Sequence, residues 1–211
     1  MGRGISGLKG SYFKAAAVAG ILIFLVFTAA CSGDLLGYIK DMIAQAECKG
    51  IIDLPKTGQT TSSGTRDDGD LQMGVAWPDP RFTVGTGAEA GCITDNLTGL
   101  MWEQAPSATQ MNWSGALTYA IDLNALNLGG HTDWRLPNRK ELRSLVNYEE
   151  ASIATWLNGQ GFTNVQPDGY WSSTTYAPNT TSAWFVVMIY GSVGYFNKTD
   201  NYYVLAVRSG Q

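Results

Sequence analysis

Near the middle of the chain stands the motif Asp133-Trp134-Arg135-Leu136-Pro137, and Tyr170-Trp171-Ser172-Ser173-Thr174 follows it. Upstream, residues 95–102 read Asp-Asn-Leu-Thr-Gly-Leu-Met-Trp, and near the C-terminus residues 203–208 read Tyr-Val-Leu-Ala-Val-Arg. Tryptophan has a large apolar surface that stabilises a compact core when it is buried. The predicted core tryptophans are Trp102, Trp134, Trp171 and Trp184.

Two helices are predicted around the first of these motifs. Ser114 is a candidate N-cap, because a serine hydroxyl accepts a hydrogen bond from a backbone N–H of the first turn, and Gly129-Gly130 ends the connection. The second helix begins after Pro137, with Asn138 as its cap, and runs over residues 139–146. The expected buried positions of the two helices are Ala116, Leu117, Ala120, Ile121, Leu123, Leu142, Leu145 and Val146.

The chain changes its hydrophobic period after the second helix. Residues 184–190 are apolar at nearly every position, which is typical of a central strand buried on both faces. Turns at Gly191 and at residues 199–201 precede a final strand over residues 202–208. With a first strand at residues 100–102, this order of elements indicates an α+β domain.

The four motifs, in this order, resemble those of the Lcl C-terminal domain family, a bacterial relative of the C-type-lectin fold associated with surface adhesion and ligand display. The similarity runs from about Leu54 to Arg208. It implies a C-type-lectin-like domain in which two helices pack on a twisted antiparallel sheet with long loops, and in which the first strand pairs with the last. Asp133 and Arg135, on either side of Trp134, are expected to pair locally and to fix the start of the second helix.

The resemblance places a ligand-binding surface in the loops and strands near the C-terminus. The composition there is typical of a paratope, because tyrosine supplies rigid contact area while short polar side chains supply adaptable hydrogen bonds. Tyrosine rings also stack on the apolar face of a sugar. The competing interpretation gives the alternate tyrosines a core or strand-pairing role. The candidate ligand-binding residues are Tyr190, Ser192, Tyr195, Asn197, Thr199, Asp200, Asn201 and Tyr202.

Catalytic chemistry is not indicated by the sequence. His131 is the only histidine, and no serine or cysteine nucleophile stands beside it in the chain. The formylglycine-generating enzymes share a related fold but depend on cysteines in the C-terminal part, where this chain has none after Cys92. We therefore expect a protein without enzymatic activity and without catalytic residues.

The N-terminus reads as a secretion signal. Three basic residues precede an apolar run over residues 15–30, which is shorter than the roughly 20 residues of a membrane span. Residues 1–30 are predicted to be a lipoprotein signal peptide, with Cys31 as the lipidated residue, and an uncleaved anchor is the alternative. Ser32 after the cysteine favours the outer membrane of a Gram-negative bacterium. Both interpretations place the folded part outside the cytoplasm, held at the membrane by its N-terminal part.

The remaining chain is acidic. Without residues 1–30 it has 11 Lys and Arg against 18 Asp and Glu, a net charge of −7, which argues against nucleic acid as a partner. Residues 31–70 are predicted to contain a short helix at residues 35–46 and a polar tether, and residues 71–211 the globular domain. The apolar stripe of this helix is expected to pack on the domain, on a second copy or on the membrane.

Cysteine and carboxylate patterns suggest few bound groups. With Cys31 assigned to lipid, Cys48 and Cys92 form an even pair that predicts a disulfide in an oxidising compartment, and two free thiols are the alternative. No metal site and no cofactor are expected. Asp67-Asp68-Gly69-Asp70 and Gln166-Pro167-Asp168 are the two candidate calcium sites, but both lack the remaining ligands of a known calcium loop.

The sequence leaves three functions open. The first is a lipid-anchored, adhesin-like protein that binds a glycan or a protein ligand through its C-terminal face. The second is a display domain for protein ligands that is diversified by a retroelement. The third is a structural subunit of a surface assembly, formed as a homo-oligomer.

Overall fold

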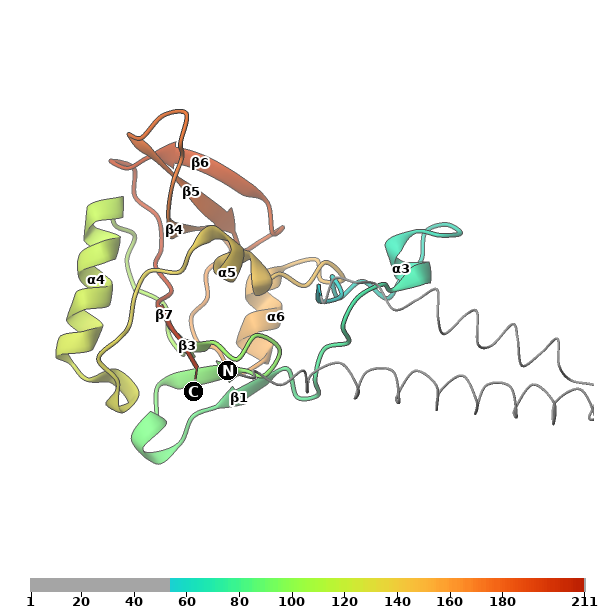
Figure 1. Cartoon of the computed structure of the whole chain (residues 1–211), viewed down its shortest axis with the longest axis horizontal. Coiled ribbons are helices and arrows are strands. Elements are labelled where there is room, and N and C mark those ends of the chain that lie inside the picture. The colour runs from blue at the N-terminus through green and yellow to red at the C-terminus, as the bar shows by residue number, and fades with distance from the viewer. Residues whose placement is uncertain (1–53, 211) are drawn as a thin grey trace, which may run out of the picture. The chain divides into compact units, whose positions relative to one another are not determined.

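The protein contains two antiparallel sheets, and its computed structural model describes residues 54–210 (Figure 1). Met101 pairs with Arg208 and Trp102 with Val207, which confirms that the strand predicted at residues 100–102 pairs with the last strand. It is not the first strand, because two others precede it. The first sheet has the strand order β1 (Phe82–Val84), β2 (Cys92–Asp95), β3 (Met101–Glu103) and β7 (Val207–Arg208).

The second sheet consists of β4 (Gly169–Thr175), β5 (Ser182–Val187) and β6 (Val193–Asn197), in that order. The central strand β5 confirms the strand predicted from Trp184, but it ends at Val187, so Tyr190 lies in the turn that follows. The chain after β6 contributes only the two residues of β7 as regular strand, together with single bridges such as Met111 to Tyr202.

The expected arrangement of two helices on one sheet is therefore wrong in detail, although the α+β class is correct. A third core helix, α6 (Ile153–Gly159), was missed because its two turns are too short to display a clear apolar period. Ser152 caps it by accepting from the backbone N–H of Thr155. The other helical segments are α3 (Asp68–Leu71), α4 (Trp113–Ala125), α5 (Arg139–Ser144) and the 3-10 turns η1 (Gly87–Glu89) and η2 (Leu128–Gly130).

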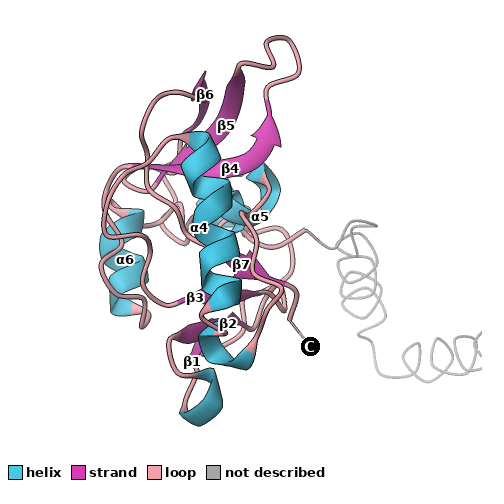
Figure 2. Cartoon of the chain, turned by 90° about the vertical axis from the view of Figure 1, so that its left-hand side faces the viewer, coloured by secondary structure: helices cyan, strands magenta, loops and turns pink. Residues whose placement is uncertain are grey.

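Helix α4 runs along both sheets (Figure 2). Near its start Ala116 packs with Trp171 of the second sheet, and near its end Leu123 packs with Met101 of the first. Its N-cap is Asn112, whose side chain accepts from Gly115 N, and not the predicted Ser114. Of the positions expected to be buried on this helix, Ala116, Ala120 and Leu123 are buried, but Ile121 is 64% exposed.

Helix α5 begins as predicted. Asn138 accepts from the backbone N–H of Glu141, and the Glu141 carboxylate accepts from the N–H of Asn138, which completes a capping box. Leu142, Leu145 and Val146 are buried in the main core, between α5, α6 and the sheets.

Three of the four predicted core tryptophans are buried. Trp102 and Trp171 are fully buried and Trp134 nearly so, but Trp184 is only half-buried and lies at the surface of β5. Trp184 is therefore not a core residue.

The expected pairing of Asp133 with Arg135 is wrong. Arg135 instead forms a bidentate ion pair with Glu141, at 2.7 Å for both contacts, and Asp133 pairs with Arg208 Nε at 2.7 Å. In an extended chain, residues i and i+2 point to the same side but are two residues apart along the backbone. Asp133 and Arg135 therefore do not contact each other, and each pairs with a residue from another segment.

Part of the predicted tether is attached to the domain. The backbone N–H groups of Thr60 and Thr61 donate to the Glu149 carboxylate at 2.8 and 3.0 Å, and Tyr148 N donates to Thr57 O at 3.1 Å. Trp77 Nε1 adds a bond to Lys56 O. Residues 57–61 therefore belong to the folded part, whereas Cys31, Cys48 and the helix predicted at residues 35–46 lie outside the described residues.

Candidate ligand-binding surface

Three aromatic side chains form a partly exposed cluster on the second sheet, near the start of β5. Trp184 on β5 and Tyr195 on β6 are directly opposite each other in the ladder, so their side chains share one face of the sheet. Tyr176, just after β4, joins them from the hairpin that connects β4 to β5. We call these three residues, together with Arg139, the aromatic platform.

The rings of the aromatic platform contact one another in defined geometries. Tyr176 and Tyr195 are stacked, with centroids 3.8 Å apart and an angle of 6° between the rings. Trp184 stands edge-on to both, at 5.3 Å from Tyr176 and 5.8 Å from Tyr195. A hydrogen bond with the Tyr195 hydroxyl raises the pKa of Tyr176. Tyr195 is nevertheless 49% exposed, so a large apolar ring surface faces solvent.

Arg139 places a positive charge on this cluster. Its guanidinium lies 4.3 Å from the ring centroid of Trp184, which is the geometry of a cation–π contact. Arg139 forms no ion pair within the described chain, so its N–H donors are available to a ligand. The aromatic platform thus combines exposed ring faces with an uncompensated cation.

Two of the sequence motifs hold this surface in place. Residues 170–174 form most of β4, and residues 133–137 lead into α5. Ser173 N donates to Pro137 O at 2.8 Å, and Arg139 N donates to Thr174 Oγ1 at 3.0 Å, so the end of β4 is joined to the start of α5. Ser172 Oγ donates to Trp184 O at 2.7 Å and ties β4 to β5 beneath the rings. The motifs position the aromatic platform without contributing its ring surface.

The predicted ligand-binding residues do not form one surface. Tyr190, which is 70% exposed, and Ser192 lie in the hairpin turn between β5 and β6. Asn197, Thr199 and Asn201 are exposed at the opposite end of β6, about 14 Å or more away for a strand of this length. The predicted set is therefore divided between the two ends of the strand.

The two central tyrosines of the prediction also lie on opposite faces of the sheet. Tyr202 stacks on Phe185 at 5.1 Å and contacts Trp171 edge-on at 5.0 Å, on the side covered by α4. Tyr195 faces the other way, toward Trp184. Asp200, half-buried, is near Tyr202 and raises the pKa of its hydroxyl, although burial is the larger cause.

Sequence reasoning missed three members of the aromatic platform. Trp184 was assigned to the core, and neither Tyr176 nor Arg139 was proposed as part of this surface. Nothing in the local sequence shows that α5 lies against β5, so only the tertiary arrangement brings Arg139 to Trp184.

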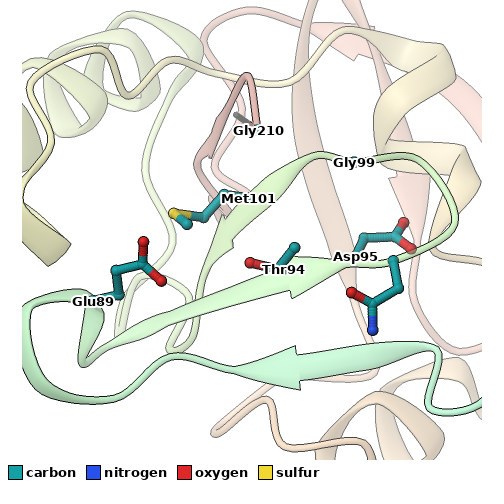
Figure 3. A pocket seen from close by; sticks show the side chains of 7 residues that line it. Glu89, Thr94, Asp95, Gly99, Met101 and Gly210 are labelled. Atoms are coloured by element: carbon teal, nitrogen blue, oxygen red, sulfur yellow. The ribbon is translucent and has the colours of Figure 1, made fainter.

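A hollow of about 300 Å³ lies beside β2 and β3 of the first sheet (Figure 3). Its lining is mixed polar and apolar, and its volume is at the lower limit of ordinary ligand pockets. The Asp95 carboxylate is already occupied, because it accepts two hydrogen bonds from Arg81 and others from the turn that follows. Glu89 supplies the other carboxylate of the lining. The lining residues are Glu89, Thr94, Asp95, Asn96, Gly99, Met101 and Gly210.

The Glu103 carboxyl is the most perturbed acid of the described chain. It is enclosed between α4 and the C-terminal segment, where Oε2 accepts from the Tyr119 hydroxyl at 2.8 Å and Oε1 from Ala206 N at 2.6 Å. Burial raises the pKa of Glu103 to about 8, and the two hydrogen bonds oppose that rise. Because it is 2% exposed, this group joins two elements and does not reach a ligand.

The carboxylates weighed for calcium have structural partners. Asp67 Oδ1 caps α3 by accepting from Asp70 N, and its other oxygen accepts from Ser63 N and Gly64 N. These bonds lower the pKa of Asp67. Asp168 accepts from Gln110 Nε2 and from Gly169 N. Within residues 54–210, no cluster of three or more metal-ligating side chains is present.

Cys92 is buried on β2 with a free thiol, and burial raises its pKa. Its predicted disulfide partner Cys48 lies outside the described residues, so the pairing stays a prediction. In the part of the chain that the structure describes, no helix has the length and apolar character needed to span a membrane.

The comparisons agree with the motifs. No curated protein matches the chain. The family model of the Lcl C-terminal domain matches residues 91–208, a range that contains both sheets except β1, the three core helices and the whole aromatic platform. The chain therefore belongs to the Lcl C-terminal domain family.

Proposed function

We propose that the protein is a non-enzymatic, extracytoplasmic binding protein, adhesin-like, that recognises a glycan through the aromatic platform. The observation that carries this proposal is the exposed stack of Tyr176 and Tyr195 beside Trp184, with Arg139 lying over the indole. Aromatic faces bind the C–H surface of a pyranose, and the arginine supplies directional donors to hydroxyl or acidic groups.

Family membership supports a surface or binding role, and the C-type-lectin-like topology is part of the proposal. The setting proposed with it is a lipid anchor at Cys31 on the outer membrane, reached after removal of residues 1–30.

The absence of catalysis is proposed on the same structural grounds. His131 is half-buried, its Nε2 atom has no hydrogen-bond partner in the described chain, and no side-chain hydrogen bond there joins it to a serine or cysteine nucleophile. The Cys92 thiol is fully buried, and burial holds it in the protonated form, which is the inactive form of a nucleophile.

The test is binding of the purified protein to an array of neutral and acidic glycans, compared with Trp184→Ala and Tyr195→Ala. Each loss of a ring is expected to weaken binding roughly fivefold, because a stacking contact is worth about 1 kcal/mol. Tyr190→Ala is the matched control, since that exposed tyrosine lies at the other end of the β5–β6 hairpin. Equal loss in Tyr190→Ala, or no saturable binding to any glycan, would refute the aromatic platform as the site.

Arg139→Met tests the cationic part of the aromatic platform, with Arg143→Met as control on the same helix. Methionine keeps most of the apolar stem but removes the charge, so acidic glycans are expected to lose more affinity than neutral ones. Arg143 is exposed and bonded to the Tyr148 hydroxyl, away from the rings. A similar effect of both substitutions would show that only net charge matters.

A further inference from the structure

Strand β6 is an edge strand whose outer backbone groups have no partner among the described residues. Val187 N donates to Ser192 O and Lys198 N donates to Thr181 O, which sets the hydrogen-bonded positions at even-numbered residues of β6. In an antiparallel ladder the alternate residues point their N–H and C=O groups away from the neighbour. Val193 and Tyr195 therefore present these groups outward, and no backbone hydrogen bond engages them there.

The other edge of the same sheet is occupied. Trp171 N donates to Tyr203 O at 3.0 Å, Tyr203 N donates to Gly169 O at 3.0 Å, and Ser173 N donates to Pro137 O. Strand β4 thus has its outer groups satisfied by the chain itself. The contrast identifies β6 as the open edge of this sheet.

Strand β6 also lacks the features by which proteins protect an edge. Its five residues, Val193–Asn197, include no proline and no charged side chain, and the ladder between β5 and β6 has no bulge. Tyr195 and Phe196, which are 49% and 44% exposed, present aromatic surface on the two faces of the strand. An added strand would find both hydrogen-bonding groups and apolar contacts on either side.

We infer that this edge accepts an extended peptide segment of a partner protein, with apolar side chains at alternate positions, which adds to the sheet as a strand beside β6. Only another extended backbone repeats donors and acceptors at every second residue, a spacing of about 6.8 Å, and a sugar does not. The alternate side chains of such a peptide would meet Tyr195 on one face and Phe196 on the other.

The side chains of the peptide follow from the exposed rings at this edge. Tyr195 and Phe196 offer apolar contact on the two faces of β6, which favours apolar side chains at alternate positions of the added strand. The cations Arg139 and Lys198 lie away from the open edge, because Arg139 covers Trp184 on β5 and Lys198 Nζ donates to Thr175 Oγ1 at the end of β4.

The experiment measures binding of the full protein to a panel of fluorescent heptapeptides that alternate valine with aspartate or threonine. Each peptide is paired with two versions that carry the same side chains but have N-methyl groups on alternate residues. Methylation on the side facing β6 removes the strand hydrogen bonds, so one of the two versions is expected to lose at least about tenfold in affinity. Equal binding of all three versions, or no binding of any peptide at millimolar concentration, would overturn the inference.

Two variants at one position separate this edge from the aromatic platform. Tyr195→Ala and Tyr195→Pro both remove the ring, but only proline also removes the outward N–H, at a place where an edge strand tolerates it. Peptide binding is expected to be weaker in Tyr195→Pro than in Tyr195→Ala by about fivefold, for the loss of one hydrogen bond. Glycan binding by the aromatic platform would fall equally in both, so the two proposals fail independently.

Folding of both variants is checked by thermal unfolding, and sedimentation of the unmodified protein is measured alongside. Identical peptide affinity of the two folded variants would overturn strand addition. A protein dimer that dissociates in Tyr195→Pro but not in Tyr195→Ala would assign the edge to a second copy of the chain and so also overturn the peptide as its occupant. The small edge argues against that result, because stable interfaces bury at least about 1,000 Å².

Discussion

Glu103 shows how one buried group makes the stability of this protein depend on pH. The folded chain holds its proton up to about pH 8, whereas the unfolded chain releases it near the ordinary pKa of 4.5. Below both pKa values the acid is neutral in the folded and in the unfolded state, so its titration does not change the free energy of unfolding. Between them the unfolded state loses a proton that the folded state keeps, so the free energy of unfolding falls as pH rises.

The predicted slope from Glu103 is a loss of roughly 1 kcal/mol per pH unit between roughly pH 5 and pH 8. Glu103→Gln is expected to remove this slope, because the amide oxygen can still accept from Ala206 N and the amide nitrogen can donate to the Tyr119 hydroxyl. Urea unfolding of both proteins at pH 5, 6.5 and 8 measures it. Parallel pH profiles for the two proteins would contradict the assignment.

Arg81 and Asp95 form a buried ion pair. The guanidinium makes two hydrogen bonds to the carboxylate, at 2.8 and 3.0 Å, and lies against the Trp77 ring at 4.3 Å. Arg81→Leu leaves a buried carboxylate without its counter-ion and is expected to cost about 3–5 kcal/mol of stability. Denaturant unfolding gives the value. Asp95→Asn in the Arg81→Leu background is expected to recover part of it, and a further loss of the full amount would show that the ion pair is not the cause.

At the scale of elements, Glu149 attaches the N-terminal segment to the turn before α6. Its hydrogen bonds with the Thr61 side chain and with the backbone of Thr60 and Thr61 lower the pKa of Glu149 to about 2. The contribution of these bonds is present above pH 4.5 and is lost as the pH falls through about 2.

Glu149→Ala is therefore expected to raise the amide hydrogen-exchange rates of Thr60 and Thr61 without changing those of β5. The backbone groups lose an ionised acceptor, whereas the core is untouched. Glu150→Ala is the control, since this neighbouring exposed side chain makes no hydrogen bond in the described chain. Unchanged exchange at Thr60 and Thr61 would show that the contact does not hold the segment.

Elements with strong local signals could be predicted from the sequence, and the others could not. The start of α5 is predictable from Asn138 and Glu141, which are three residues apart and form a capping box in the structure. The start of α4 was misplaced because Asn112 and Ser114 are both good caps, and which of them is used depends on Trp113, whose indole N–H donates to Ser172 O far along the chain. β1 has only three residues, too few for an alternating pattern.

At the scale of the whole molecule, the candidate surface depended on contacts that no local pattern encodes. The predicted residues all come from one stretch, residues 190–202, whose side chains point to both faces of the sheet, so Tyr195 and Tyr202 do not share one side. The aromatic platform instead collects its members from α5, the β4–β5 hairpin, β5 and β6. Tyr195 is the one predicted residue that belongs to it, and its neighbours on that surface come from distant segments.

The burial of residues 204–208 has a consequence for when the domain can fold during synthesis. Val204 through Val207 are fully buried, and Arg208 nearly so, while their partners Glu103, Ser107 and Arg135 lie about a hundred residues or fewer upstream. The core around Trp102 therefore cannot close until residues 204–208 are available. The nascent chain exposes the apolar residues of that core until then, so the domain closes only after this segment has been synthesised.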